Sequence, residues 1–252
     1  MDRGNNSREK IADIDPRIIA VKEKLKNVER IIIVTSGKGG VGKTLIASTS
    51  AILLSTQGYK VGLLDLDFHG PTCHVVLGAG DIIPKEDRGI IPPQVEGLKF
   101  MSIAYYAKDR PVPLRGRDIT NAMIEIMAIT RWNSLNFLLI DTPPGYGEEI
   151  LDLIRLIERK EALIVSTPSF LSIETVSRLI RLLKDMKVAI LGIIENMSHG
   201  EGSVEKLAKK HGISFLGSIP YNPEIEELLG KPRELLRTKF AQHLADIWSL
   251  IS

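Results

Sequence analysis

Short aliphatic runs recur along the chain, and segments with helical periodicity separate most of them. Such runs are typical of strands that are buried on both faces of a parallel sheet. They cover residues 31–35, 61–65, 98–104, 137–141, 162–166, 188–195 and 213–219. The helical patterns cover residues 44–56, 118–131, 148–157, 173–186 and 203–210. This alternation predicts an α/β fold with a doubly wound, mainly parallel sheet flanked by helices.

The remaining segments set the boundaries of the fold. Residues 1–15 are polar, and Pro16 is suited to open a short helix that ends near residue 27. Residues 78–97 are rich in glycine, proline and charge, which predicts an excursion or a short hairpin. Residues 232–251 form one helical pattern with an apolar stripe, which we expect to pack on its own domain. We therefore predict an N-terminal extension with a short helix at residues 1–27 and a single domain at residues 28–252.

Composition narrows the class of protein. The 252 residues are 44% hydrophobic and carry a net charge of +2, which gives no strong field for nucleic acid or membrane. Cys73 is the one cysteine, so the chain has no internal disulfide. No stretch approaches the roughly 20 apolar residues of a membrane span, and no apolar segment near the start is typical of a signal peptide. We expect a cytoplasmic protein.

A phosphate-binding loop follows the first predicted strand. The sequence GKGGVGKT at residues 37–44 lies between that strand and a predicted helix, which is the context a P-loop requires. Glycines let backbone N–H groups close around phosphates, and the helix N-terminus adds a positive dipole. Lys43 is expected at the β- and γ-phosphates, and the Thr44 hydroxyl is expected to ligate Mg²⁺. The predicted nucleotide-binding residues here are Gly37, Lys38, Gly39, Gly40, Val41, Gly42, Lys43, Thr44 and Leu45.

Two strands end in carboxylates. Residues 61–65 run into DLDFHGPT, and residues 137–141 run into DTPPG. Both ends belong to the carboxyl edge of the sheet, where ligands of open α/β folds bind. A carboxylate there can hold Mg²⁺, and another can orient the attacking water. The alternative is that Asp67 and Asp141 are helix caps or turn formers.

These motifs carry a family resemblance. GKGGVGKT, DLDFHGPT and DTPPG, in this order, resemble the deviant-Walker-A ATPases, the MinD/ParA/Mrp group. Four further segments are similar to the Mrp/ApbC-type iron–sulfur carrier ATPases: LRGRD, RWNSLNFLLIDTPPG, GIIENMS and FLGSIPYNPEI. The similarity runs from about residue 28 to the end of the chain. It implies a P-loop NTPase fold of the SIMIBI type and an Mg²⁺-dependent ATPase.

The resemblance also implies catalytic roles. Lys38 matches the signature lysine that reaches across an ATP-dependent homodimer to the partner's phosphates. Asp67 matches the aspartate that positions the hydrolytic water, and Lys43 completes the catalytic set. Asp65 and Asp141 match residues around Mg²⁺, mostly through water.

The base is expected to meet a different part of the chain. Asn196 in ENMS matches the side chain that reads the adenine edge of ATP or ADP. Pro220 belongs to the loop at residues 219–221, which lies against the base in the family.

The sequence departs from the Mrp-type pattern at one place, and this departure concerns the iron–sulfur cluster and not the ATPase. Mrp-type carriers have a CPxC segment shortly after the NMS motif, whereas here HGEGSVEKLAKK follows it without a cysteine. Thiolates are the usual ligands of iron–sulfur clusters, so a bound cluster is doubtful. Cys73 is either a small packed residue or a ligand shared across a dimer, and His199 and His211 are surface residues or metal ligands.

Two functions stay open at this stage. One is a role in iron–sulfur cluster or metallocofactor assembly, with a cluster carrier or an apo-client protein as partner. The other is a MinD/ParA-like positioning or regulatory switch that binds a protein, membrane or DNA without carrying a cluster.

Overall fold

The computed structural model describes residues 15–80, 82–107 and 116–251. Most of the expected extension, residues 1–14, therefore lies outside the described residues, and so do the first two residues of the LRGRD segment.

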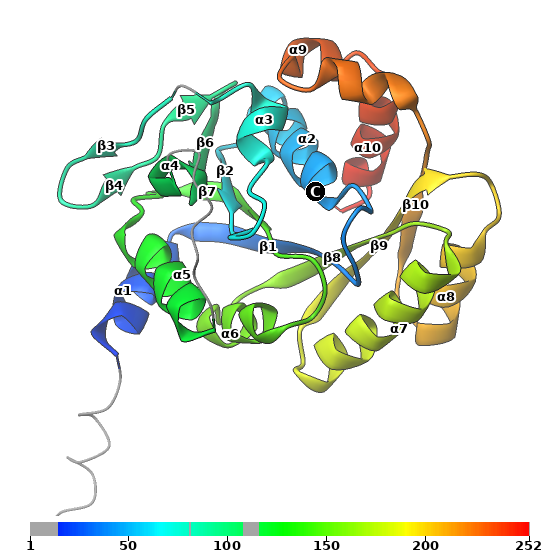
Figure 1. Cartoon of the computed structure of the whole chain (residues 1–252), viewed down its shortest axis with the longest axis horizontal. Coiled ribbons are helices and arrows are strands. Elements are labelled where there is room, and N and C mark those ends of the chain that lie inside the picture. Colours follow the sequence, from blue (N-terminus) through cyan, green and yellow to red (C-terminus); the bar gives the residue numbers. More distant parts are fainter. Residues whose placement is uncertain (1–14, 81, 108–115, 252) are drawn as a thin grey trace, which may run out of the picture.

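One sheet of eight strands forms the centre of the described chain, in the order β10-β9-β8-β1-β7-β2-β6-β5 (Figure 1). All neighbours are parallel except β5, which pairs antiparallel with β6. The strands are β1 (Val28–Ser36), β2 (Val61–Asp65), β5 (Gln94–Val95), β6 (Leu98–Ser102), β7 (Leu135–Asp141), β8 (Glu161–Ser166), β9 (Ala189–Ser198) and β10 (Phe215–Pro220). This arrangement confirms the predicted doubly wound, mainly parallel sheet.

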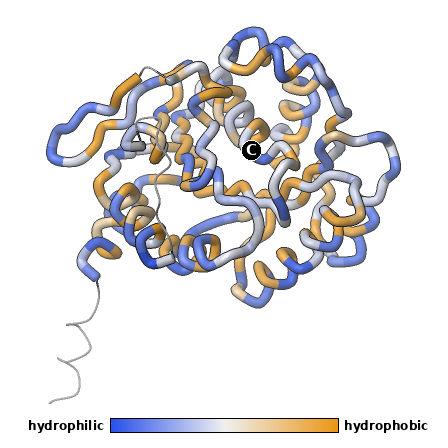
Figure 2. The backbone as a smooth tube through the Cα atoms, viewed as in Figure 1, coloured by the Kyte–Doolittle hydropathy of each residue, from blue (hydrophilic) through white to orange (hydrophobic). Residues whose placement is uncertain are grey.

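Helices cover both faces of the sheet (Figure 1). One face carries α2 (Lys43–Thr56), α3 (Cys73–Leu77), α9 (Pro232–Leu235) and α10 (Lys239–Ser249). The other carries α1 (Pro16–Leu25), α5 (Arg117–Ile129), α6 (Glu148–Leu156), α7 (Phe170–Asp185) and α8 (Ser203–His211). Alternate residues of a strand point to opposite faces, so Ile31 and Ile33 join one core while Ile32 and Val34 join the other. The strands are accordingly hydrophobic along most of their length (Figure 2).

Short elements complete the fold. Within residues 78–97, β3 (Lys85–Glu86) and β4 (Ile90–Ile91) pair antiparallel, which confirms the short hairpin. The sequence did not predict β5, α3, the four-residue helix α4 (Ala104–Ala107) or the 3-10 helix η1 (Pro223–Leu228). Each is too short for its periodicity to register.

The C-terminal segment packs on the sheet, as expected, but it is not one helix. Helix α9 ends at Leu235 and α10 begins at Lys239, because Thr238 caps α10 by accepting a hydrogen bond from the Ala241 N–H. The apolar stripe of α10 is buried against β10 and α2. Within the described ranges, no helix combines the length and the apolar character that crossing a bilayer requires.

Candidate nucleotide site

The loop between β1 and α2 lies at the carboxyl edge of the sheet, where β1 runs between β7 and β8. Two of its glycines are required by close contacts. Gly42 has φ +81°, and a Cβ atom there would lie 2.2 Å from Nδ2 of Asn196. A Cβ atom on Gly37 would lie 2.6 Å from the backbone nitrogen of Val176 in α7. The loop is therefore wedged between the end of β9 and helix α7.

A cavity of about 450 Å³ opens over this loop. Lys38 to Leu45 all line it, and Asn196, Pro220 and Asp67 line it from other segments. Gly37 does not line the cavity, because it faces α7 instead. The sequence interpretation missed several apolar lining residues from α3, from η1 and the residue after it, and from α10: Val75, Val76, Ile225, Leu229 and Phe240. A cleft of this volume, apolar with a few polar groups, is the usual form of a small-molecule site.

The end of β9 and the end of β10 form one wall of the cavity. The Asn196 side chain donates from Nδ2 to the Val41 carbonyl at 2.9 Å, so it contacts the phosphate loop directly. Met197 follows with φ +55°, a conformation that non-glycine residues seldom adopt. Tyr221 is exposed beside Pro220, with its ring 6.5 Å from that of His199.

Lys43, Thr44 and Asp141 are joined by direct contacts. Lys43 Nζ lies 2.6 Å from Asp141 Oδ1, and the two side chains are 6% and 0% exposed. The Thr44 hydroxyl donates to Asp141 Oδ2 at 2.7 Å. The structure thus brings together a lysine, a hydroxyl and a carboxylate that lie 97 and 98 positions apart in the chain.

Asp65 is the register neighbour of Asp141, because β2 and β7 pair side by side. Its carboxyl group is fully buried and accepts hydrogen bonds from the N–H groups of Asp67 (3.1 Å) and Cys73 (3.2 Å). The Ser102 hydroxyl at the end of β6 lies 3.3 Å away and also donates to it. Neither Asp65 nor Asp141 lines the cavity, but Asp141 contacts Lys43 and Thr44, which do.

Burial controls the protonation of this pair. It raises the pKa of Asp65 to about 7, and the charge of Asp141 adds to the rise, while the two backbone N–H groups oppose it. Burial also raises the pKa of Asp141, against the opposing effects of Lys43 and Thr44. Carboxyl groups perturbed in this way are typical of functional sites.

Asp67 lies at the rim and is only partly buried. Its Oδ1 atom accepts hydrogen bonds from the N–H groups of His69 and Gly70, both at 3.1 Å. These contacts form a local turn that fixes the carboxylate at the cavity. The turn-forming role considered from the sequence is therefore real, and it is compatible with a role in the site.

Cys73 begins α3 and is fully buried. Its thiol contacts Asp141 Oδ2 at 3.7 Å. Burial raises the pKa of the thiol well above its ordinary value, and the carboxyl groups of Asp65 and Asp141 add to the rise. A side chain with no exposed surface cannot reach a second subunit, so the hypothesis of a ligand shared across a dimer is wrong. His211 contacts Ser177 through Nε2 at 2.8 Å and belongs to the packing of α8 on α7.

A third buried carboxylate, that of Glu195, was missed by the sequence interpretation. Glu195 precedes Asn196 in β9 and is fully buried. It accepts hydrogen bonds from the Ser198 hydroxyl, from the Val204 N–H at 3.3 Å and from the Ser218 hydroxyl at 3.4 Å. The signal that could have identified it is a charged residue at the end of the aliphatic run at residues 188–195. Glu195 ties the end of β9 to the start of α8 and to β10.

Comparison with known proteins places the chain in a family. A family model described as ParA, NUBPL iron-transfer P-loop NTPase, matches residues 27–251. An iron-sulfur cluster carrier protein of Aquifex aeolicus is 36% identical over 82% of this chain, which spans only 61% of that relative's length. The iron-sulfur cluster carrier protein of Methanocaldococcus jannaschii is 36% identical over 90% of this chain and 85% of its own length.

Solved structures agree with this placement. A nucleotide-binding protein from Archaeoglobus fulgidus, in complex with ADP, superimposes with a TM-score of 0.77 at 32% identity and covers 89% of this chain and 96% of its own. The cell division ATPase MinD of Pyrococcus furiosus has a TM-score of 0.68 at 22% identity over 89% and 98%, and shares the fold. The chain is thus a nucleotide-binding P-loop ATPase that belongs to the ParA-type family of NUBPL iron-transfer NTPases.

Proposed function

We propose that this ATPase is Mg²⁺-dependent, works as an ATP-bound homodimer and serves iron–sulfur cluster or metallocofactor assembly. One observation carries the ATPase mechanism: the buried side chains of Lys43 and Asp141 and the half-buried Thr44 form a connected group at the cavity. ATP phosphates offer Lys43 an alternative anionic partner to Asp141. The lysine then stabilises the charge that develops on the γ-phosphate during attack by water.

The metal site is assigned to Thr44, Asp65 and Asp141. Two carboxylates and a hydroxyl are the hard oxygen ligands that Mg²⁺ prefers, so the residues fit the ion. Bound with ATP, Mg²⁺ would supply charge neutralisation at the phosphates. Asp65 and Asp141 lie one layer behind Thr44, which suits contact with the ion through water.

Asp67 is assigned to the hydrolytic water. Backbone N–H groups hold its Oδ1 atom, and within the described chain its Oδ2 atom makes no hydrogen bond, which leaves this atom to accept one from water. Catalysis by such a site comes from positioning and from charge, without a covalent intermediate. We assign Asn196 to the adenine edge and Pro220 to the face of the base, on the wall described above.

The homodimer is proposed from the surface beside the phosphate loop. Phe170 and Leu171, at the start of α7, are 75% and 67% exposed, and the same helix touches Gly37. Two adjacent large apolar side chains in water favour a covering partner. A second copy placed on this face would bring its own Lys38, which lines the cavity rim, to the phosphates of the first.

Steady-state ATPase activity against protein concentration tests the dimer. Activity per subunit should rise with concentration to a plateau, and Lys38→Ala should lower that plateau at least about tenfold, the loss of roughly 1.4 kcal/mol of transition-state stabilisation. Lys206→Ala, an exposed lysine on α8, is the matched control and should behave as wild type. Activity per subunit that is independent of concentration and insensitive to Lys38→Ala would refute the dimer mechanism.

The cargo is inferred from the relatives, which are iron-sulfur cluster carrier proteins. Since Cys73 is the only cysteine and is buried, we propose that the chain assists a cluster carrier or an apo-client protein and does not bind a bridging cluster on exposed thiolates. Anaerobic incubation with iron and sulfide should then give no stoichiometric cluster absorbance. A pull-down with Asp67→Ala, expected to stall the ATP-bound state, should retain a cluster protein or its client.

The missing thiolates also favour a second function, a MinD/ParA-like switch without cargo. In that case the same pull-down would recover no cluster protein. ATP-dependent sedimentation with liposomes or DNA would instead distinguish the membrane and nucleic-acid forms of the switch.

A further inference from the structure

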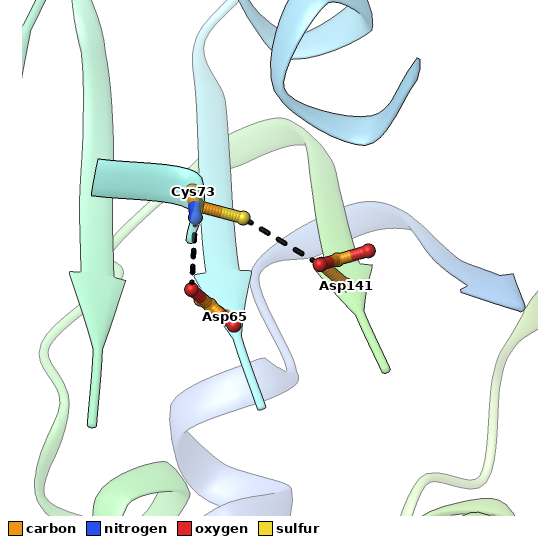
Figure 3. Close-up of side chains that lie close together, drawn as sticks. All are labelled: Asp65, Cys73 and Asp141. Carbon is orange, nitrogen blue, oxygen red and sulfur yellow. Dashed lines mark hydrogen bonds between the residues drawn. The ribbon is translucent and has the colours of Figure 1, made fainter. Parts of the chain in front are cut away.

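Three potential metal ligands converge behind the phosphate loop: Asp65 from β2, Cys73 from α3 and Asp141 from β7 (Figure 3). Their ligand atoms all lie within 4.8 Å of one another, and the thiol points at the Asp141 carboxylate at 3.7 Å. An ion bonded to sulfur at about 2.3 Å and to oxygen at about 2.1 Å holds these two atoms roughly 3 to 3.6 Å apart. One ion therefore fits after small side-chain movements.

A fourth polar group, the hydroxyl of Ser48, lies next to the Cys73 thiol. Ser48 lies one turn after Thr44 in α2 and is fully buried. Its hydroxyl makes no hydrogen bond in the part of the chain that the structure describes. The hydroxyl is nevertheless close enough to the Cys73 thiol to oppose the rise in the pKa of that thiol. A buried hydroxyl without a partner is unfavourable, so a further polar group or ion beside Ser48 would be stabilising.

Charge and ligand type identify that group. Within the described residues, the ion pair between Lys43 and Asp141 is the one salt bridge made by the three ligands. Two carboxylates and a thiolate carry three negative charges, and a dication together with Lys43 carries three positive charges. The metal site is then neutral overall, which is favourable for buried ions. Thiolate sulfur selects ions such as Zn²⁺ and Fe²⁺ over Mg²⁺, which prefers oxygen. Entry is short, because Lys43, Thr44 and Thr72 all line the cavity.

We propose that Asp65, Cys73 and Asp141 bind one thiophilic divalent cation of the Zn²⁺ and Fe²⁺ class. The site shares Asp65 and Asp141 with the proposed magnesium site, and in this respect alone it rests on the proposed function. Because both ions use the same carboxylates, the thiophilic ion and Mg²⁺·ATP exclude each other. A soft metal would thereby hold the ATPase in an inactive, metal-loaded state.

Absorption spectroscopy of the full chain with Co²⁺ tests the proposal, after EDTA treatment and removal of nucleotide. Co²⁺ replaces Zn²⁺ in such sites, and cobalt–thiolate coordination gives a charge-transfer band in the near ultraviolet. Cys73 is the only cysteine, so a stoichiometric band in the wild type can arise only from this residue. We expect the band, its loss on adding Zn²⁺, and its absence from Cys73→Ser and Cys73→Ala. His199→Gln, which changes an exposed potential ligand, is the matched control and should keep it.

A wild-type protein that shows no sulfur charge-transfer band at saturating Co²⁺ would overturn the proposal, whether or not the Cys73 variants fold. A band that excess Mg²⁺·ATP does not diminish would overturn the mutual exclusion. Binding of a fluorescent ATP analogue with Mg²⁺ is measured separately on metal-free wild type. Failure there would overturn the proposed function and leave the cobalt result as an independent test of the metal site.

Discussion

Replacing Asp65 by asparagine is expected to change how the stability of the protein depends on pH. The carboxyl group has a pKa of 3.8 in an unfolded chain and about 7 in the folded protein, because it is buried beside Asp141. Between these values the folded state holds a proton that the unfolded state has lost. The stabilisation from Asp65 is therefore complete below pH 3.8 and disappears as the pH rises through 7.

The size of the effect follows from the same two values. Each pH unit between them costs about 1.4 kcal/mol of unfolding free energy. From pH 5 to pH 8 the wild type should lose roughly 2 to 3 kcal/mol through this group alone. Asparagine has nearly the same shape and no charge. Its amide oxygen can replace only one of the two accepting oxygens of Asp65, because the NH₂ group accepts no hydrogen bond. This cost does not depend on pH and cancels in the comparison.

Urea denaturation at pH 5 and pH 8 measures the effect, on protein freed of metal and nucleotide. Relative to wild type, Asp65→Asn should gain those 2 to 3 kcal/mol between the two pH values, estimated as above. Asp185→Asn, an exposed aspartate on α7, is the control and should show no such gain. A difference between Asp65→Asn and wild type that is equal at both pH values, within about 0.5 kcal/mol, would refute the reasoning.

Three further changes probe other parts of the molecule. Gly37→Ala places a methyl group 2.6 Å from the α7 backbone, so the phosphate loop must shift. Affinity for a fluorescent ATP analogue should then fall at least about tenfold. Unchanged affinity would contradict the close contact between the loop and α7. Leu244→Ala opens a cavity under α10 and should lower the unfolding free energy by about 2 to 5 kcal/mol in urea, whereas a loss below about 1 kcal/mol would mean that α10 packs loosely. Burial and the cations Arg181, Lys184 and Lys210 lower the pKa of His211 from 6.5. Wild type should therefore lose unfolding free energy relative to His211→Gln as the pH falls below 6.5. A difference in unfolding free energy that stays constant from pH 7.5 to pH 5 would contradict this.

The sheet could be predicted from the sequence because its strands are buried on both faces. Such strands appear as unbroken aliphatic runs, and the run at residues 61–65 coincides with β2. Edge strand β5 has two residues and α3 has five, too few to give a period. The break at Thr238 was hidden because Leu236 and Phe240 keep helical spacing across it.

Some contacts of the candidate site could also be predicted from the sequence, and others could not. The contact of Lys43 and Thr44 with Asp141 follows from a P-loop and an acidic strand end at one edge of a parallel sheet. Two other contacts could not be predicted, because they depend on the strand order β7-β2-β6, which the sequence pattern does not specify. They are the contact of Cys73 with Asp141 and the contact of Ser102 with Asp65.

Glu195 has a consequence for engineering the chain and for comparing it with relatives. Its carboxylate fixes Ser198 before the 199–202 loop and the N–H of Val204 after it, so both ends of that loop are held independently of its length. His199 and Gly200 are exposed, and long surface loops are entropically tolerated. The loop is therefore a suitable site for an insertion, and a cysteine-bearing segment placed there should leave the cavity wall in place. For the same reason, relatives can gain or lose such a segment with little change to the rest of the fold.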